Sequence, residues 1–356
     1  MAKYTRLRTG RLVSELIQTA NCGERCFDSV NSNALISTYL RKTSRKHPFC
    51  CNLERDKALW PPLKRTISDT VSNHIACSKI MPDYIDEHWR SILVFNGLTD
   101  FESFWELEAP WFEEPNHRRG GWSGVSRCEL KLPDGGTRAI FLKRQENHCT
   151  FSWRAPFRGI PTFCREFKHI MNYQSKSIPS LNPVYFAVRR TGKDRRAILI
   201  TEELTGFTSL EDIVDTWLKG GAPSRVRRRH ILKSVAELVQ RMHGHGIQHS
   251  CLLAKHVFVR QNADGSVNAR VIDLEKSRWR PFRTLCAMRD LHSLNRFSSC
   301  WNLTDRLWFF KEYLAISHLT PYAKWLWRNI GARSVKKNRI RTSPQAILSE
   351  TRDTSR

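Results

Sequence analysis

The sequence predicts an α+β fold of two lobes, a small β-rich lobe followed by a larger, mainly helical lobe. Alternating apolar and polar residues predict two strands within 128–143. Apolar residues at helical spacing predict a long helix over 224–243. A Trp-rich stretch from 289 to 330 continues the helical pattern. Strands followed by a run of helices are typical of an α+β architecture.

The predicted small lobe opens with a glycine-rich loop at 120–126 and a β-hairpin. The first strand of the hairpin covers 128–132 and the returning strand covers 138–143. Between them, the Pro-Asp-Gly-Gly run at 133–136 has the residue types of a tight turn. The glycines of the loop are Gly120, Gly121 and Gly124.

A helix is predicted next, over 161–170. Pro161 suits a helix start, and Phe163, Phe167 and Ile170 recur at helical spacing. The remaining predicted strands are two apolar runs at 184–188 and 197–201 and a short hairpin at 257–259 and 269–272.

Charge and composition bound the function. The chain has 356 residues, a formal net charge of +25 and 40% hydrophobic residues, which excludes a disordered acidic tail, a collagen-like repeat and a small disulfide scaffold. The positive excess predicts anionic partners such as nucleic acid, phospholipid headgroups or phosphorylated sugars. With no zinc-finger or RNA-binding motif in support, we do not expect a nucleic-acid partner.

The sequence also bounds the cellular location. It has no run of 18 or more apolar residues, and Arg6, Arg8 and Arg11 interrupt the region where a secretory signal would lie. The eleven cysteines are scattered, as expected of reduced thiols in a cytosolic protein. We therefore expect a cytoplasmic protein, with peripheral contact to an anionic inner-membrane surface through its basic stretches. The oligomeric state is left open.

Changes in composition and in the periodicity of apolar residues divide the chain into four segments. Residues 1–80 carry a net charge of +8 and little periodicity, as expected of a disordered basic extension. Because the composition changes at Met81 to Trp, Phe, Leu and acidic residues, one hypothesis is that translation begins there. The other predicted segments are an N-lobe at 81–205, a helical C-lobe at 206–332 and a basic flexible tail at 333–356.

Five features occur in the order that phosphoryl transfer requires. The glycine-rich loop at 120–126 precedes Lys143 on the returning strand and Glu166 on the next helix. His249 then lies at a turn after the long helix, and Asp273 ends an apolar strand. A loop over phosphates, a Lys, a Glu that holds it and a metal-binding carboxylate are the parts of a protein-kinase-like site.

Four motifs carry a resemblance to a known family, and it extends over about 81–330. The sequence resembles the lipopolysaccharide kinases of the heptose/Kdo kinase group, and most closely their InaA-type branch. The motifs lie at 141–148, 158–163, 248–259 and 272–278.

The resemblance implies a bilobal protein-kinase-like fold that binds ATP with Mg²⁺ or Mn²⁺ between its lobes. Lys143 would contact the nucleotide phosphates beneath the loop glycines, with Glu166 as its ion-pair partner. Asp273 would hold the metal, and His256 stands where kinases usually carry a metal-binding Asn. The implied acceptor is a hydroxyl of heptose or Kdo in the inner core of lipopolysaccharide.

One departure from the family pattern concerns the catalytic turn. Active kinases of the family have His-Arg-Asp there, whereas this chain has His249 followed by Ser250 and Cys251. A thiol with a pKa of about 8.5 accepts a proton poorly. We expect His249 to brace the turn and Cys251 to be a small buried residue.

Two interpretations follow from this departure. Glu275 is a possible substitute for the missing carboxylate, so that the chain remains a kinase. Alternatively, the protein is a pseudoenzyme that binds nucleotide or glycolipid without phosphoryl transfer. A protein Ser/Thr kinase is disfavoured because no Ala-Pro-Glu motif follows Asp273.

Overall fold

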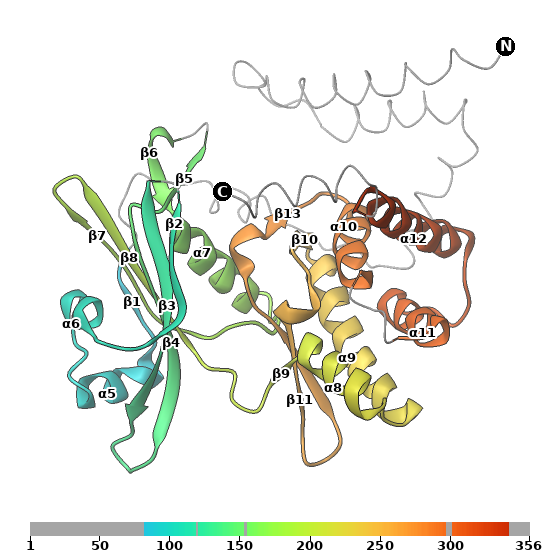
Figure 1. Ribbon diagram of the computed structural model, residues 1–356, viewed down its shortest axis with the longest axis horizontal. Helices are drawn as coiled ribbons and strands as arrows, with labels where there is room; N and C mark the ends of the chain where they lie inside the picture. The colour runs from blue at the N-terminus through green and yellow to red at the C-terminus, as the bar shows by residue number, and fades with distance from the viewer. Residues whose placement is uncertain (1–81, 119, 153–154, 297–300, 342–356) are drawn as a thin grey trace, which may run out of the picture. The chain divides into compact units, whose positions relative to one another are not determined.

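The computed structural model describes residues 82–118, 120–152, 155–296 and 301–341. These residues form a β-rich N-lobe and a helical C-lobe, as the sequence predicts (Figure 1). The predicted basic extension at 1–80 lies outside the described residues.

The N-lobe is built on a six-stranded antiparallel sheet. In their order across the sheet, the strands are β1 (Tyr84–Ile85), β7 (Pro183–Thr191), β8 (Asp194–Glu202), β4 (Thr137–Glu146), β3 (Gly121–Lys131) and β2 (Trp111–Arg118). A separate hairpin consists of β5 (Cys149–Ser152) and β6 (Ala155–Pro161). The predicted hairpin and the two later strands are thereby confirmed as β3, β4, β7 and β8.

Helices cover both faces of the sheet, and two neighbouring residues of β7 show how. Tyr185 packs against Phe104 at 4.3 Å between ring centroids, and Phe186 stacks on Phe167 at the same distance. Because successive strand residues point to opposite faces, the helices that carry these two phenylalanines lie on opposite sides. The helices of this lobe are α5 (Glu87–Phe95) and α6 (Phe101–Glu106) on one side and α7 (Thr162–Gln174) on the other.

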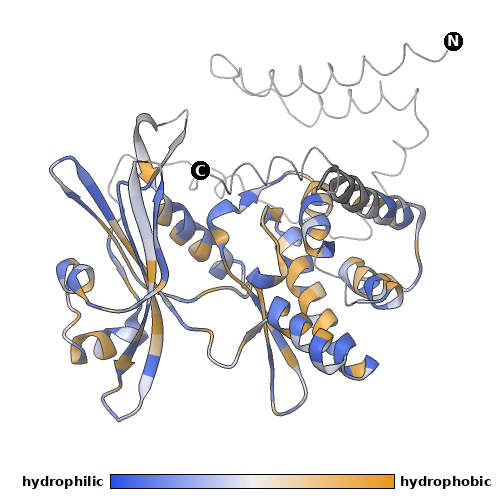
Figure 2. Cartoon of the chain, viewed as in Figure 1, coloured by the Kyte–Doolittle hydropathy of each residue, from blue (hydrophilic) through white to orange (hydrophobic). Residues whose placement is uncertain are grey.

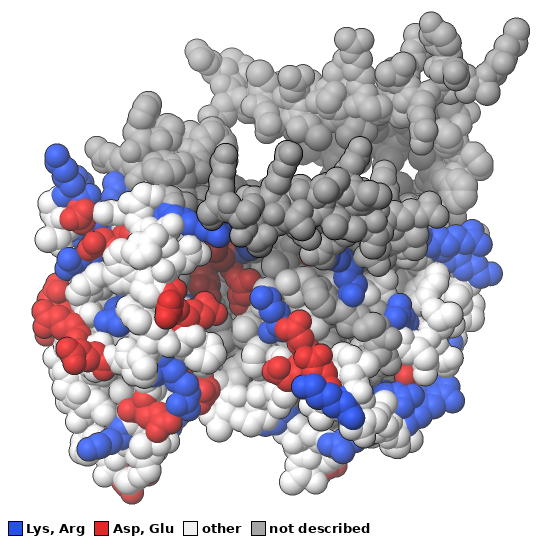
Figure 3. Space-filling view, viewed as in Figure 1, with Lys and Arg blue, Asp and Glu red and all other residues white. Residues whose placement is uncertain are grey.

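The core of the N-lobe lies between the sheet and the helix pair α5 and α6. Phe104, Leu142 and Ile198 are fully buried there, and Leu93 is almost so. Along β3 and β4, buried positions alternate with less buried ones, and both strands carry apolar and polar residues (Figure 2). Acidic side chains gather on the outer surface of α6, in keeping with the net charge of −6 over residues 81–119 (Figure 3).

The C-lobe is organised around a central helix. That helix, α9, buries one apolar face, which includes Val235, Val239 and Met242, and it confirms the predicted helix at 224–243. The helices of the lobe are α8 (Leu210–Gly220), α9 (Arg225–Gly244), α10 (Arg283–Asn295), α11 (Leu303–Leu314) and α12 (Pro321–Arg341), with the short helices η2 (Ala254–His256) and η3 (Leu274–Lys276).

Small strands complete the C-lobe, and its candidate site residues lie in the turns and short helices next to these strands. The strands are β9 (Thr208–Ser209), β10 (Ile247–Gln248), β11 (Val257–Gln261), β12 (Val267–Val271) and β13 (Arg278–Trp279). The antiparallel pair β11 and β12 is the predicted short hairpin.

Two predictions of extent were wrong. The glycine-rich segment 120–126 is not a loop throughout, because β3 begins at Gly121 and pairs with β4 from Ser123 onward. The tail expected at 333–356 is helical as far as Arg341, since α12 continues through a run rich in Lys and Arg, which are good helix formers.

No helix in the described part of the chain is both long enough and apolar enough to cross a membrane.

Candidate functional site

The N-lobe contributes a buried ion pair to the candidate site. Lys143 Nζ lies 2.6 Å from Glu166 Oε1, with side-chain exposures of only 18% and 6%. Lys143 lies on the central strand β4 and Glu166 on the second turn of α7. Burying either charge alone would cost several kcal/mol, so each requires the other in this environment. The pair expected from the sequence is therefore present.

Gln145 fixes the start of α7 beside this pair. Its Oε1 accepts hydrogen bonds from the Thr162 hydroxyl at 2.7 Å and from the Phe163 amide at 3.0 Å. The helix has no side-chain cap of its own, because Pro161 occupies the cap position, and Gln145 supplies the missing acceptor. Lys143 and Gln145 share one face of β4, just as Thr162 and Glu166 share one face of α7. The Gln145 contacts therefore orient the helix for the ion pair.

The far end of α7 is tied to the C-lobe. The Tyr173 hydroxyl, fully buried, forms a hydrogen bond of 3.1 Å with the Ser277 hydroxyl and donates to Met242 Sδ at 3.2 Å. Ser277 directly follows η3, which begins after Asp273. One helix thus links Glu166 in the N-lobe to the chain segment that follows Asp273.

The three glycines of the predicted loop have different surroundings. Gly120, with φ +77°, makes the turn between β2 and β3. A Cβ on Gly121 would lie 2.0 Å from the backbone oxygen of Glu146, and one on Gly124 would lie 2.6 Å from the Trp111 ring. Gly121 and Gly124 are therefore required by close packing within the sheet, and Gly120 alone of the three lies at the hairpin turn.

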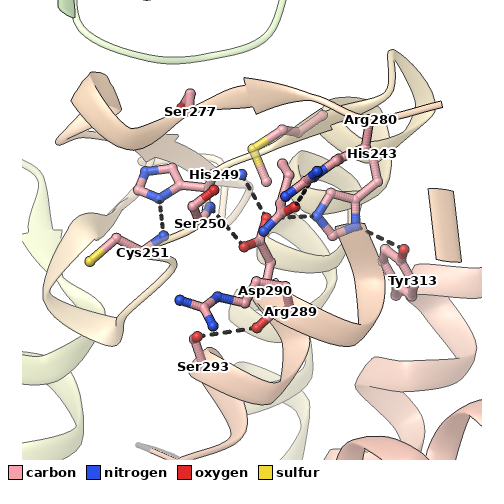
Figure 4. Close-up of polar contacts among 12 residues, drawn as sticks. His243, His249, Ser250, Cys251, Ser277, Arg280, Arg289, Asp290, Ser293 and Tyr313 are labelled. Atoms are coloured by element: carbon pink, nitrogen blue, oxygen red, sulfur yellow. Dashed lines mark hydrogen bonds and ion pairs between the residues drawn. The ribbon is translucent and has the colours of Figure 1, made fainter. Parts of the chain in front are cut away.

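The turn at 249–251 is held by a carboxylate that the sequence analysis did not single out. Asp290, fully buried on α10, accepts hydrogen bonds from the backbone amides of His249 at 2.7 Å and Ser250 at 2.9 Å (Figure 4). His243 Nε2 lies 3.2 Å from the same carboxylate, and its Nδ1 lies 2.8 Å from the Tyr313 hydroxyl. Ser250 adopts a positive φ of 69°, so these bonds hold a strained backbone.

His249 joins this turn to the end of β12. Its Nε2 lies 2.9 Å from the carbonyl oxygen of Ile272, and its Nδ1 accepts from the Cys251 amide at 3.3 Å. These partners assign the proton to Nε2, and burial lowers the pKa of the imidazole, which favours the neutral form. In this geometry His249 connects the turn to the residue preceding Asp273.

Three potential metal ligands converge where these segments meet. The ligand atoms of Cys251, His256 and Asp273 all lie within 4.8 Å of one another. Asp273 adopts the left-handed backbone conformation, at φ 56° and ψ 59°. His256 Nδ1 lies 2.9 Å from the Cys251 carbonyl oxygen, which leaves Nε2 facing the Asp273 carboxylate at 3.5 Å.

This donor set fits a divalent cation. A ring nitrogen tied to a backbone carbonyl, with the other nitrogen directed at the ion, is the usual arrangement of a metal-binding histidine. The carboxylate suits Mg²⁺ or Mn²⁺, and the imidazole adds affinity for transition metals. The structure thus brings together Asp273, His256 and Cys251, and separately pairs Lys143 with Glu166.

Gln145 and Asp290 are the positioning residues that sequence reasoning missed. Each is a polar side chain within an element, and each has partners 17 to 41 residues away along the chain. Neither residue has a signal in the sequence that separates it from a polar residue at the surface.

The two lobes define a protein-kinase-like fold. The model of the lipopolysaccharide kinase (Kdo/WaaP) family matches residues 102–313, and the chain belongs to this family. It is similar to protein InaA of Escherichia coli K12, at 32% identity over 56% of this chain and 88% of the relative. It is also similar to the lipopolysaccharide core heptose(I) kinase WaaP of Escherichia coli, at 30% identity over 62% of this chain and 84% of the relative.

A solved structure has the same fold. WaaP in complex with acyl carrier protein superposes with a TM-score of 0.53 and 19% identity, covering 74% of this chain and 100% of that chain. The relatives support the predicted InaA-type branch within a kinase family, and a kinase family implies a nucleotide and a divalent cation.

Proposed function

We propose that this protein is an ATP-dependent kinase that phosphorylates a hydroxyl of heptose or Kdo in the lipopolysaccharide inner core. The observation that carries the proposal is the buried Lys143–Glu166 ion pair. A lysine held in this way presents its charge to nucleotide phosphates, which is the arrangement that phosphoryl transfer requires. The hairpin turn at Gly120 is the part of the N-lobe that would cover those phosphates.

Asp273 and His256 are the residues that would hold the divalent cation. When bound, the cation neutralises charge on the phosphate oxygens. The acceptor oxygen bonds to the γ-phosphorus as the bond to the β–γ bridging oxygen breaks. ADP then leaves and the hydroxyl proton passes to solvent. Because such transition states are largely dissociative, positioning carries much of the rate.

Cys251 is the reason for a second candidate function. It stands where active members of the family are expected to carry a carboxylate, and a thiol orients an acceptor hydroxyl less well than a carboxylate does. A pseudoenzyme that binds nucleotide or glycolipid would retain the Lys143–Glu166 pair and lack transfer. Glu275 follows Asp273 by two residues and is the available substitute carboxylate.

We further propose that the protein works at the cytoplasmic face of the inner membrane. Arg225, Val226 and Arg227 at the start of α9 are all exposed, with Val226 at 65%. Basic side chains beside an exposed apolar one suit an anionic lipid surface, which is where the acceptor glycolipid would be met.

The experiment compares acceptors and uses purified full-length protein with labelled ATP and Mg²⁺ or Mn²⁺. Core lipopolysaccharide that contains heptose is tested beside a truncated form that contains Kdo alone. Label on either acceptor, lost in Lys143→Met, is the expected result, and the two forms identify the sugar. ATP binding without label on either acceptor would favour the pseudoenzyme.

A further inference from the structure

A pocket adjoins the turn at 249–251, apart from the Lys143–Glu166 pair. It has a volume of about 380 Å³. Five basic or polar side chains and one leucine, from three segments, line it: Gln248, Ser250, Arg278, Arg280, Leu285 and Arg289. Arg280, Arg289 and Ser250 lie around the buried Asp290 in Figure 4.

The positive charge of this pocket is compensated only in part, by the buried Asp290. Within the described residues, neither Arg278 nor Arg289 forms an ion pair, and the Arg280 guanidinium donates to the neutral Gln248 Oε1, at 2.8 Å. Asp290 is already committed to two backbone amides and to His243. Partial burial lowers the pKa of Arg278, and the neighbouring charges of Arg280 and Arg289 lower it further. Like charges held together in this way favour an anion between them.

Ser250 adds an unsatisfied hydrogen-bonding group to the same pocket. Its hydroxyl oxygen is buried and, among the described residues, has no hydrogen-bond partner. Leaving a buried hydroxyl unpaired costs free energy. A ligand that accepts this hydrogen bond would remove the cost, so the hydroxyl and the guanidinium groups require the same kind of partner.

We propose that this pocket binds an anionic substituent, carboxylate or phosphate, of the acceptor sugar. The inference rests on the proposed function, because it assigns the pocket to the acceptor and not to the nucleotide. Ser250 immediately precedes Cys251, so the pocket adjoins the residue that would face the acceptor hydroxyl. Guanidinium groups bind both carboxylates and phosphates with two parallel hydrogen bonds.

The pocket also accounts for how a site without an acidic catalytic residue selects its acceptor. Holding the sugar by its charged substituent orients a neighbouring hydroxyl, which is the task that a carboxylate at position 251 would share. Arg278, Arg280, Arg289 and Ser250 are therefore specificity-determining residues for an acidic sugar.

The test measures binding of small probes to the full chain by calorimetry. The probes are free Kdo, whose charge is a carboxylate, glucose 1-phosphate, whose charge is a phosphate, and neutral glucose. The variants are Arg278→Ala and Arg289→Ala, both at exposed positions without ion pairs. Arg190→Ala, an exposed arginine on β7 of the N-lobe, is the matched control.

We expect at least one charged probe to bind the wild type and Arg190→Ala equally, and to bind each pocket variant at least tenfold more weakly. Glucose should not bind. Binding of Kdo alone or of the sugar phosphate alone identifies the substituent. No binding of either charged probe, or equal binding to all variants, would overturn the proposal.

A kinase assay separates this proposal from the proposed function. With an acidic core acceptor, the pocket variants should raise the KM for the acceptor about tenfold and leave the KM for ATP unchanged. Loss of phosphate transfer in every protein, with probe binding intact in the wild type, would refute the kinase and retain the pocket. Equal acceptor KM values in all variants would refute the pocket and retain the kinase.

Discussion

Replacing Asp290 with asparagine removes the charge that holds the turn at 249–251. The carboxylate accepts two backbone hydrogen bonds, from His249 at 2.7 Å and from Ser250 at 2.9 Å, in a fully buried environment. An asparagine of the same shape keeps one acceptor oxygen and turns its amide group toward the other N–H. One hydrogen bond is lost, and one buried donor is left without a partner.

The magnitude follows from these contacts. A hydrogen bond to a charged group contributes about 1.5–3 kcal/mol. We therefore expect Asp290→Asn to lower the free energy of unfolding by about 3 kcal/mol. For a folded region of this size, that corresponds to a fall in Tm of roughly 6–12 °C.

Urea unfolding of the full chain measures this free energy, and hydrogen exchange reports on the two amides directly. The amides of His249 and Ser250 should lose protection in Asp290→Asn. Asp264→Asn is the control, since Asp264 lies in the exposed turn between β11 and β12, and its change should stay within about 0.5 kcal/mol. Unchanged protection at His249 and Ser250, or a loss of stability no larger than in the control, would refute the reasoning.

Three further predictions concern the strand packing, the pH dependence and the catalytic turn. Gly121→Ala places a methyl group 2.0 Å from a backbone oxygen of β4, so the Tm of this variant should fall by several degrees. The control Gly220→Ala meets nothing within 4 Å and should leave the Tm unchanged. Equal Tm values for the two variants would contradict the prediction. Burial lowers the pKa of His169 to about 4 from an ordinary value of 6.5. Between pH 6.5 and about pH 4 the unfolded chain therefore binds a proton more readily than the folded chain. The free energy of unfolding should fall as the pH drops through this range. In urea unfolding, His169→Gln should reduce this slope by up to about 1.4 kcal/mol per pH unit, and an identical slope would argue against it. Cys251→Asp supplies the missing carboxylate and should raise the rate of phosphate transfer about 10–100-fold, and no gain would count against assigning Cys251 to the acceptor position.

Local patterns predicted the elements that are periodic in sequence. The apolar face of α9 and the alternation along β3 and β4 follow from which residues meet the core, so spacing alone identifies them. The strand β2 is exposed at nearly every position and has no such alternation. The helix α6 is only six residues long and begins at the cap residue Asp100. Neither therefore offers a periodic signal.

The candidate site was predictable where residue order along the chain carries the information. Lys143, Glu166 and Asp273 were identified from their order and their predicted elements, and the ion pair of the first two is present. Gln145 and Asp290 act through backbone groups brought close only by the fold. A buried carboxylate on a helix and a surface one have the same sequence appearance, so only the structure separates them.

The most direct test of the central claim is phosphate transfer from labelled ATP to purified core lipopolysaccharide by the wild type and by Asp273→Ala. The proposed kinase predicts transfer by the wild type and a loss of at least about a hundredfold in the variant, because the cation would lose its carboxylate ligand. Exposed Asp264→Ala serves as the control and should transfer at the wild-type rate. No transfer by wild-type protein that still binds ATP would contradict the kinase and favour a nucleotide-binding pseudoenzyme.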